Sequence, residues 1–183
     1  MSARTTIQHI YPRLMAIHDL HETIAVPDPD TGFIDFPSLM RDSHLFMAGH
    51  GVYLIDNEDV VMLWIGASVS PQLLQDLFGV EDINDVNRSL TQLPRIDSLL
   101  STQIRNILAH RQLERGGRVP KFMITRQNMD GSELEFSDLL VEDQNNAAMS
   151  YLDYLCLVHK QINIVLTGAG TLSGTSSLRG SPW

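Results

Sequence analysis

The stretch Val52-Tyr-Leu-Ile-Asp-Asn-Glu-Asp-Val-Val-Met-Leu-Trp-Ile65 holds two short apolar runs, 52–55 and 60–65, and it decides the fold that we predict. Four polar residues separate the runs, which suits a hairpin loop. The second run does not alternate between apolar and polar residues, and such a strand must be covered on both faces. We therefore predict an α/β (α+β) domain in which a central sheet lies between two layers of helices.

The residues on either side supply further elements. Ser70 is placed to cap a helix over Pro71–Phe78, which Gly79 ends. A longer helix from about Ser98 to Leu113 has apolar residues at helical spacing, with Asp97 or Ser98 as its cap. The other elements expected are strands over Ile10–Ile17 and Val119–Arg126, a short helix over Leu134–Val141 and a final helix over 149–162.

We divide the chain into four parts. Residues 1–9 are a lead-in, residues 10–146 form the α/β domain and residues 147–163 form an amphipathic helix. The last part, 164–183, is expected to be a disordered tail rich in Gly, Ser and Thr. One apolar stripe runs along the amphipathic helix and consists of Met149, Leu152, Leu155, Cys156, His159 and Ile162.

Charge and composition exclude several classes of protein. The chain has 13 Lys and Arg against 22 Asp and Glu, a net charge of −9, which disfavours binding to nucleic acid or to anionic lipid. No apolar run reaches the roughly 18 residues of a membrane span, so we expect no membrane insertion. No secretory signal is visible at the first residues. The single cysteine, Cys156, excludes an internal disulfide and fits a reducing, cytoplasmic compartment.

Two stretches have ligand-type residues but the wrong spacing for a metal site. His18 and His21 stand three apart, so on a strand they would face opposite sides. Asp28-Pro-Asp-Thr-Gly32 is similar to the start of a calcium loop, but its glycine comes one residue early. The twelfth position of that loop is Leu39 and not Glu. We therefore expect no metal in this chain.

No catalytic residues are predicted. Cys156 and His159 share the apolar face of the final helix, where such a pair is more often packed than reactive. Glu142 and Asp143 are adjacent acids, and we interpret them as a solvated surface pair. The segment from Ile162 to Gly174 is similar to a strand that enters the glycine turn of a dinucleotide site, with Gly168, Gly170 and Gly174 as its glycines. The third glycine is one residue late and the given sequence leaves no room for a βαβ unit, so a flexible tail is preferred over a nucleotide-binding enzyme.

Basic residues are concentrated in one place. Residues 101–126 contain five Arg and one Lys against one Glu, which is 6 − 1 = +5. Most such clusters are solvated faces. A second interpretation is a partner-docking strip formed by Arg111, Arg115, Arg118 and Lys121.

From about Ile10 to Ile162 the chain resembles the C-terminal part of the cargo-adaptor subunit of the COPII vesicle coat, the Sec24 family. Seven matching pieces follow in family order. They are Ile10-Tyr-Pro-Arg-Leu-Met-Ala-Ile-His18, Gly51-Val-Tyr-Leu-Ile-Asp56, Leu63-Trp-Ile-Gly66, Ser70-Pro-Gln-Leu-Leu74 with Leu77-Phe-Gly-Val80, Leu93-Pro94 with Ile104-Arg-Asn-Ile107, Leu140-Val-Glu-Asp143, and Ser150-Tyr-Leu-Asp-Tyr-Leu-Cys156 with His159-Lys-Gln-Ile162.

The resemblance implies a gelsolin-like domain with a mixed sheet and helices on both faces. It implies a non-enzymatic coat component on the cytosolic face of the endoplasmic reticulum, which acts in transport to the Golgi. Its partners would be a Sec23-type coat subunit, the rest of its own parent subunit and, through the parent, cargo proteins. The zinc of the family would be bound by an upstream domain, so no cofactor is expected here, and residues 1–9 would lead in from a helical region of the parent.

The alternative within binding modules is an actin-regulating gelsolin-family domain. In calcium-binding gelsolin domains a Gly-Asp pair precedes the second strand. His50-Gly51 stand at that position here, so the acidic ligand is missing and calcium control is not expected.

Overall fold

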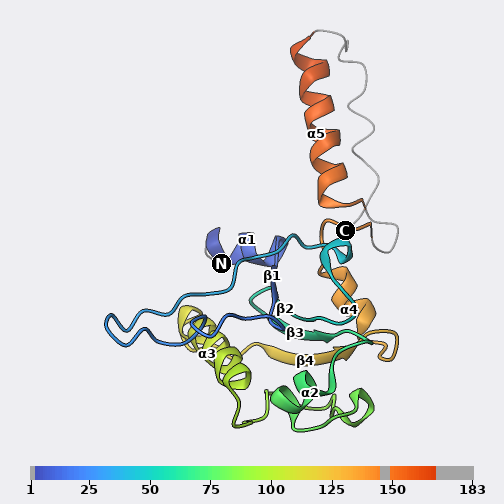
Figure 1. Cartoon of the computed structure of the whole chain (residues 1–183). Coiled ribbons are helices and arrows are strands. Elements are labelled where there is room, and N and C mark those ends of the chain that lie inside the picture. Colours follow the sequence, from blue (N-terminus) through green and yellow to red (C-terminus); the bar gives the residue numbers. More distant parts are fainter. Residues whose placement is uncertain (1–2, 145–148, 168–183) are drawn as a thin grey trace.

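The computed structural model describes residues 3–144 and 149–167, and it contains one mixed four-stranded sheet (Figure 1). The strands are β1 (Arg13–Ala16), β2 (Val52–Asp56), β3 (Val60–Ile65) and β4 (Lys121–Arg126), in the spatial order β1-β2-β3-β4. The pairs β1–β2 and β2–β3 are antiparallel, and β4 runs parallel to β3. The predicted mixed sheet is confirmed.

The β2–β3 hairpin is the centre of the core. Every residue of β2 is buried, as are Val61–Ile65 of β3. The register pairs Tyr53 with Trp64 and Leu54 with Leu63, so alternate residues point into two separate apolar clusters, one on each face. Burial of such side chains contributes roughly 1.5–3 kcal/mol each before the entropy cost of ordering.

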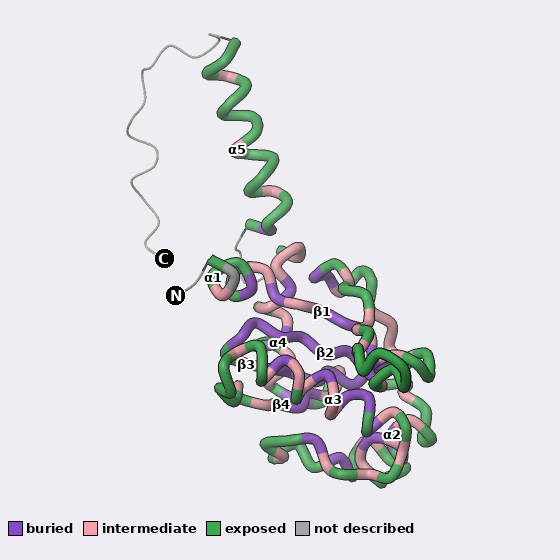
Figure 2. Tube along the Cα trace, turned by 90° about the vertical axis from the view of Figure 1, so that its left-hand side faces the viewer, coloured by how far each residue is buried: buried purple, intermediate pink, exposed green. Residues whose placement is uncertain are grey.

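Helices cover both faces of the sheet, as predicted (Figures 1 and 2). On one face α2 (Pro71–Phe78) and α3 (Leu99–Glu114) pack Leu77 and Ile104 against Leu54 and Leu63. On the other face α4 (Glu133–Asp138) packs Phe136 against Trp64, with ring centroids 6.1 Å apart. The strand β3 is therefore sealed on both sides.

Helix caps follow the sequence signals. The Ser70 hydroxyl accepts a hydrogen bond from the Leu73 N–H, and Gly79 ends α2 in the left-handed conformation with φ 72°. For α3 the cap is Ser98, whose side chain accepts from the Ser101 N–H. Two short 3-10 helices, η1 (His44–Phe46) and η2 (Ile83–Asp85), lie in connecting segments.

The N-terminal segment differs from the prediction. A helix, α1 (Ala3–Ile10), occupies the predicted lead-in, and β1 begins only at Arg13. Pro12 has no N–H and disfavours a helical residue before it, so it separates the two elements. The apolar run 10–17 therefore straddles a helix end and a strand, and it was wrong to assign all of it to a strand.

The last helix, α5 (Tyr151–Leu166), begins close to its predicted start but continues beyond 163 (Figure 1). Ile162–Leu166 are therefore helical, and the strand that a dinucleotide site would need there is absent from the described chain. The three tail glycines at 168, 170 and 174 lie outside the described residues. Within 3–144 and 149–167, no helix has the length and apolar character needed to cross a bilayer.

Candidate interaction surfaces

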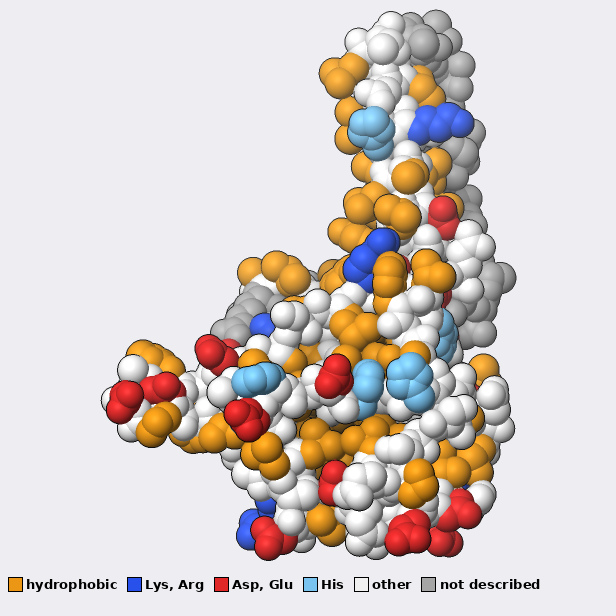
Figure 3. All heavy atoms as spheres, in the orientation of Figure 1, with side chains coloured by type: hydrophobic (Ala, Val, Ile, Leu, Met, Phe, Trp, Pro, Cys, Tyr) orange, Lys and Arg blue, Asp and Glu red, His pale blue; other side chains and the backbone are white. Residues whose placement is uncertain are grey.

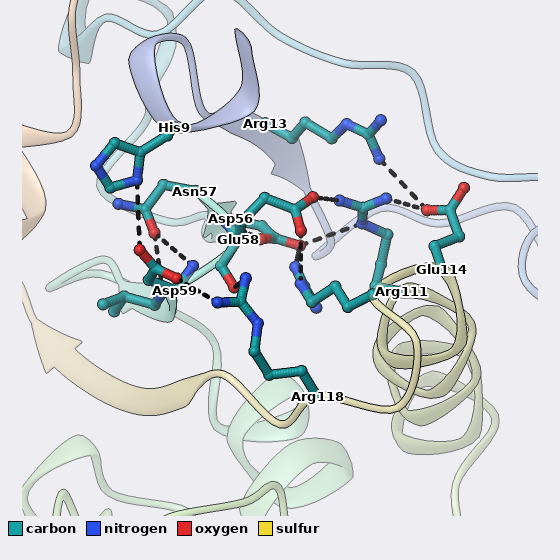
Figure 4. A network of polar contacts seen from close by, with 11 residues as sticks. His9, Arg13, Asp56, Asn57, Glu58, Asp59, Arg111, Glu114 and Arg118 are labelled. Carbon is teal, nitrogen blue, oxygen red and sulfur yellow. Dashed lines mark hydrogen bonds and ion pairs between the residues drawn. The ribbon is translucent and has the colours of Figure 1, made fainter. Parts of the chain in front are cut away.

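The β2–β3 loop is fastened to the end of α3 by a network of ion pairs (Figure 4). In this network the Arg111 guanidinium reaches Asp56 at 3.2 Å and Glu58 at 2.9 Å. Arg115 also pairs with both carboxylates, and the Arg111 and Arg115 side chains are only 4% and 2% exposed. Because each buried charge has opposite charges beside it, the network satisfies the condition under which buried ions are tolerated.

The edge of this network reaches further elements. Arg118 pairs with Asp59 at 2.9 Å, and His9 of α1 lies 3.5 Å from the same carboxylate. At the other end Glu114 contacts Arg111 and lies 3.7 Å from Arg13 of β1. The network thus connects α1, β1, the hairpin loop and α3 through ion pairs.

This geometry corrects the docking-strip hypothesis. Arg111 and Arg115 are buried against acids of their own chain, so they do not present a basic surface to a partner. Arg118 and Lys121 are exposed, and their docking role stays a prediction. The sequence shows the basic cluster, but its acidic partners lie more than fifty residues upstream.

A second polar cluster lies at the base of α5. Glu142 accepts hydrogen bonds from the Tyr11 hydroxyl and from Arg41 Nε, the latter at 2.7 Å. Asp143 accepts from the His44 N–H at 2.8 Å. The two acids therefore hold three segments together, and it was wrong to interpret them as a solvated pair. The hydrogen bond from Arg41 lowers the pKa of Glu142.

Asp42 lies beside this cluster and is fully buried. Neither of its carboxylate oxygens has a hydrogen-bond partner within the described chain. Burial, with the charge of Glu142 as a second cause, raises its pKa to about 7. Burial and the hydrogen bond to Glu142 likewise raise the pKa of Tyr11 to about 12. Near pH 7 the ionisation of Asp42 therefore works against the fold.

The remaining candidate residues lie apart from one another. His18 and His21 are in the bend that follows β1 and not on the strand. The Asp28 carboxylate accepts hydrogen bonds from Thr31 of its own loop. Cys156 is exposed on α5. In the parts of the chain that the structure describes, no three metal-ligating side chains converge.

The surface of α5 is apolar and exposed within the described parts of the chain. The helix projects from the domain, and hydrophobic side chains follow its length (Figures 1 and 3). None of its residues is buried, and Leu152, Leu155 and Ile162 of the predicted stripe are 52%, 42% and 51% exposed. Its base is anchored, since the Tyr151 ring packs edge-on against Tyr11 at 5.7 Å.

Known proteins are similar to this chain in fold and in sequence. A gelsolin-repeat family model matches residues 43–108, which hold the β2–β3 hairpin, α2 and most of α3. The transport proteins named sec24 from Neurospora crassa and SEC24 from Yarrowia lipolytica are each 32% identical, over 162 and 166 residues. These alignments cover 85% and 86% of this chain and 17% of each relative.

A solved structure agrees. The human COPII-coat protein Sec24c matches with a TM-score of 0.75 and 30% identity, over 91% of this chain and 20% of that one. The fold is thus that of a gelsolin-like domain, with its sheet enclosed by helices. Among such domains, the chain belongs to the Sec24 family. It spans about a sixth of the length of the fungal relatives that it matches.

Proposed function

We propose that this chain is the gelsolin-like domain of a COPII coat subunit that acts in transport from the endoplasmic reticulum to the Golgi. The observation that carries the proposal is the match to human COPII-coat protein Sec24c over 91% of the chain. In this function the domain is a structural and interaction module without catalysis, working on the cytosolic face of the endoplasmic reticulum. The fungal transport-protein names favour this function over actin regulation.

The exposed surface of α5 supports a role within a larger subunit. A helix with this much exposed apolar side chain usually has a partner. We propose that α5 packs against another part of the parent subunit, and that the whole subunit engages a Sec23-type partner and cargo. Arg118 and Lys121 are the exposed basic residues that we propose for docking.

The test is a pull-down of the full-length parent on a Sec23-type partner, compared with a parent that lacks residues 1–183. We expect weaker recovery of the partner or loss of coat assembly on liposomes without the domain. Equal recovery and equal assembly would contradict the coat role. A parent with R118E and K121E tests the docking residues separately, with R88E, at a 64% exposed side chain outside α5, as a charge-change control.

A further inference from the structure

A groove with a volume of about 550 Å³ runs beside the outer edge of the sheet at β4. One wall is α3, which contributes Arg105 and Leu108, and the other is the segment that contains Leu93 and Arg95. Phe122 of β4 forms part of the floor. Figure 2 shows β4 at the end of the sheet, with the backbone that follows α2 running below it. This groove belongs neither to the ion-pair network nor to the surface of α5.

The backbone of β4 has unused hydrogen-bonding groups on this side. The Lys121 N–H donates to the Asp59 carbonyl and the Gln127 N–H to the Ile65 carbonyl, both at 2.9 Å. Odd-numbered residues of β4 therefore face β3, and the N–H and C=O of Phe122 face outward. Those two groups bond to no other described residue. Pro120, just before β4, has no N–H, so pairing can begin only at Phe122.

The charge of the groove is opposite to that of the chain. Its lining has two arginines and no acid, although the net charge of the protein is −9. Among the described residues, the Arg105 guanidinium donates to two neutral oxygens, the Ser101 carbonyl at 3.1 Å and the Thr102 hydroxyl at 3.0 Å. Arg95 is exposed and pairs with no acid among the described residues. Both guanidinium groups can therefore bind a carboxylate.

We propose that this groove binds an extended peptide whose side chains on one face are alternately apolar and acidic. The peptide pairs its backbone with Phe122 as an added strand at the β4 edge. Alternate side chains of an extended peptide lie on one face, so an apolar side chain and the carboxylates two positions before and after it can enter the groove between α3 and the 90–95 segment together, where the carboxylates reach Arg95 and Arg105. This inference rests on the groove alone and holds whether or not the domain acts in a coat.

The test uses the 183-residue chain and the fluorescein-labelled hexapeptide Glu-Ser-Val-Ser-Glu-Ser, which places valine and both glutamates on one face, and binding is followed by fluorescence anisotropy. We expect saturable binding that weakens as salt is raised. Replacing glutamate by lysine in the peptide should abolish binding. Methylation of the peptide nitrogens that face β4 should weaken binding at least tenfold, because the added strand loses its donors.

The exposed Arg95→Glu variant should bind the glutamate peptide about tenfold more weakly, while K160E on α5 should bind like the unchanged chain. Arg105→Glu should also weaken binding of the glutamate peptide. If the R105E variant misfolds, the comparison of R95E with the unchanged chain decides the test. Absence of saturable binding up to about 1 mM, or equal binding by R95E and the unchanged chain, would overturn the proposal. Self-association of the chain through the β4 edge would also overturn it.

Discussion

Arg111 is a cation whose side chain is only 4% exposed, and two of its acidic partners, Asp56 and Glu58, come from a loop more than fifty positions away. Its removal would leave Asp56 and Glu58 buried with Arg115 as their remaining neutralising partner. Removing one partner of a buried ion pair destabilises the fold by more than the pair itself contributes to stability, because the remaining charge stays buried without water. The stability of the fold therefore depends on the charge of Arg111 and not only on the volume of its side chain.

We expect Arg111→Met, which keeps most of the side-chain volume, to lower the free energy of unfolding by about 3–5 kcal/mol. Arg118→Met is the matched control, since that side chain is 53% exposed and its pair with Asp59 should contribute at most about 1 kcal/mol. Urea unfolding followed by tryptophan fluorescence measures both. Equal midpoints for the two variants would contradict a buried network.

Asp42 predicts a dependence of stability on pH. Its pKa rises from an ordinary value of 3.8 to about 7 in the fold, so the folded chain holds a proton that the unfolded chain releases. Stability from this group is therefore full below about pH 4 and is lost as pH rises to about 7.

Asp42→Asn removes that loss. We expect the gain in unfolding free energy of this variant over the unchanged chain to be roughly 2–4 kcal/mol larger at pH 8 than at pH 4. The measurement is the difference in urea midpoint between the two pH values. Asp30→Asn, at an exposed loop position, should leave the pH dependence as it is. A D42N chain with an unchanged pH slope would show that Asp42 is already solvated or paired.

At the scale of elements, Gly66 marks a close approach between the end of β3 and the turn before β2. Its N–H donates to the Gly51 carbonyl at 2.9 Å, and a Cβ at this position would overlap the carbonyl group of Gly49. Gly66→Ala should therefore cost at least about 2 kcal/mol. Gly131→Ala, where a Cβ meets nothing within 4 Å, is the control and should change the melting temperature little. Equal melting temperatures would refute the close approach.

The elements with strong local signals could be predicted from the sequence. The hairpin and α2 coincide with their predictions because loop length, cap and stop residues are all local. The extent of α1 and α5 could not be read in the same way. The apolar residues at these helix ends are exposed, so no burial pattern constrains them. Periodicity therefore did not distinguish a helix end from a strand at Ile10 or at Ile162.

The polar clusters were harder to predict for a different reason. Glu142 and Asp143 are two acids in a polar stretch, and nothing near them in sequence indicates that Tyr11, Arg41 and His44 donate to them. The buried arginines pose the same problem. Both clusters depend on contacts between distant segments, which residue spacing does not encode.

For the whole molecule, the exposed α5 predicts association. We expect the isolated 183-residue chain to form oligomers as its concentration rises, because apolar side chains along this helix leave water when two copies meet. The variant L155E/I162E should shift sedimentation velocity toward the monomer. Leu113→Glu, at a 75% exposed apolar residue of α3, should not. A monodisperse monomer at high concentration would contradict the prediction.

The parallel pairing of β3 with β4 also sets an order of assembly during synthesis. Residues 66–120 separate the two strands, so β2 and β3 leave the ribosome several seconds before β4 at about 5–20 residues per second. During that interval Asp56, Glu58 and Asp59 form a cluster of like charges without the arginines that later neutralise it. We therefore expect the nascent hairpin to stay open at that end until α3 has been made. Strand β4 is synthesised within about ten residues of the arginines that pair with these acids. We therefore expect the pairing of β4 with β3 and the neutralisation of the loop acids to occur together, late in synthesis.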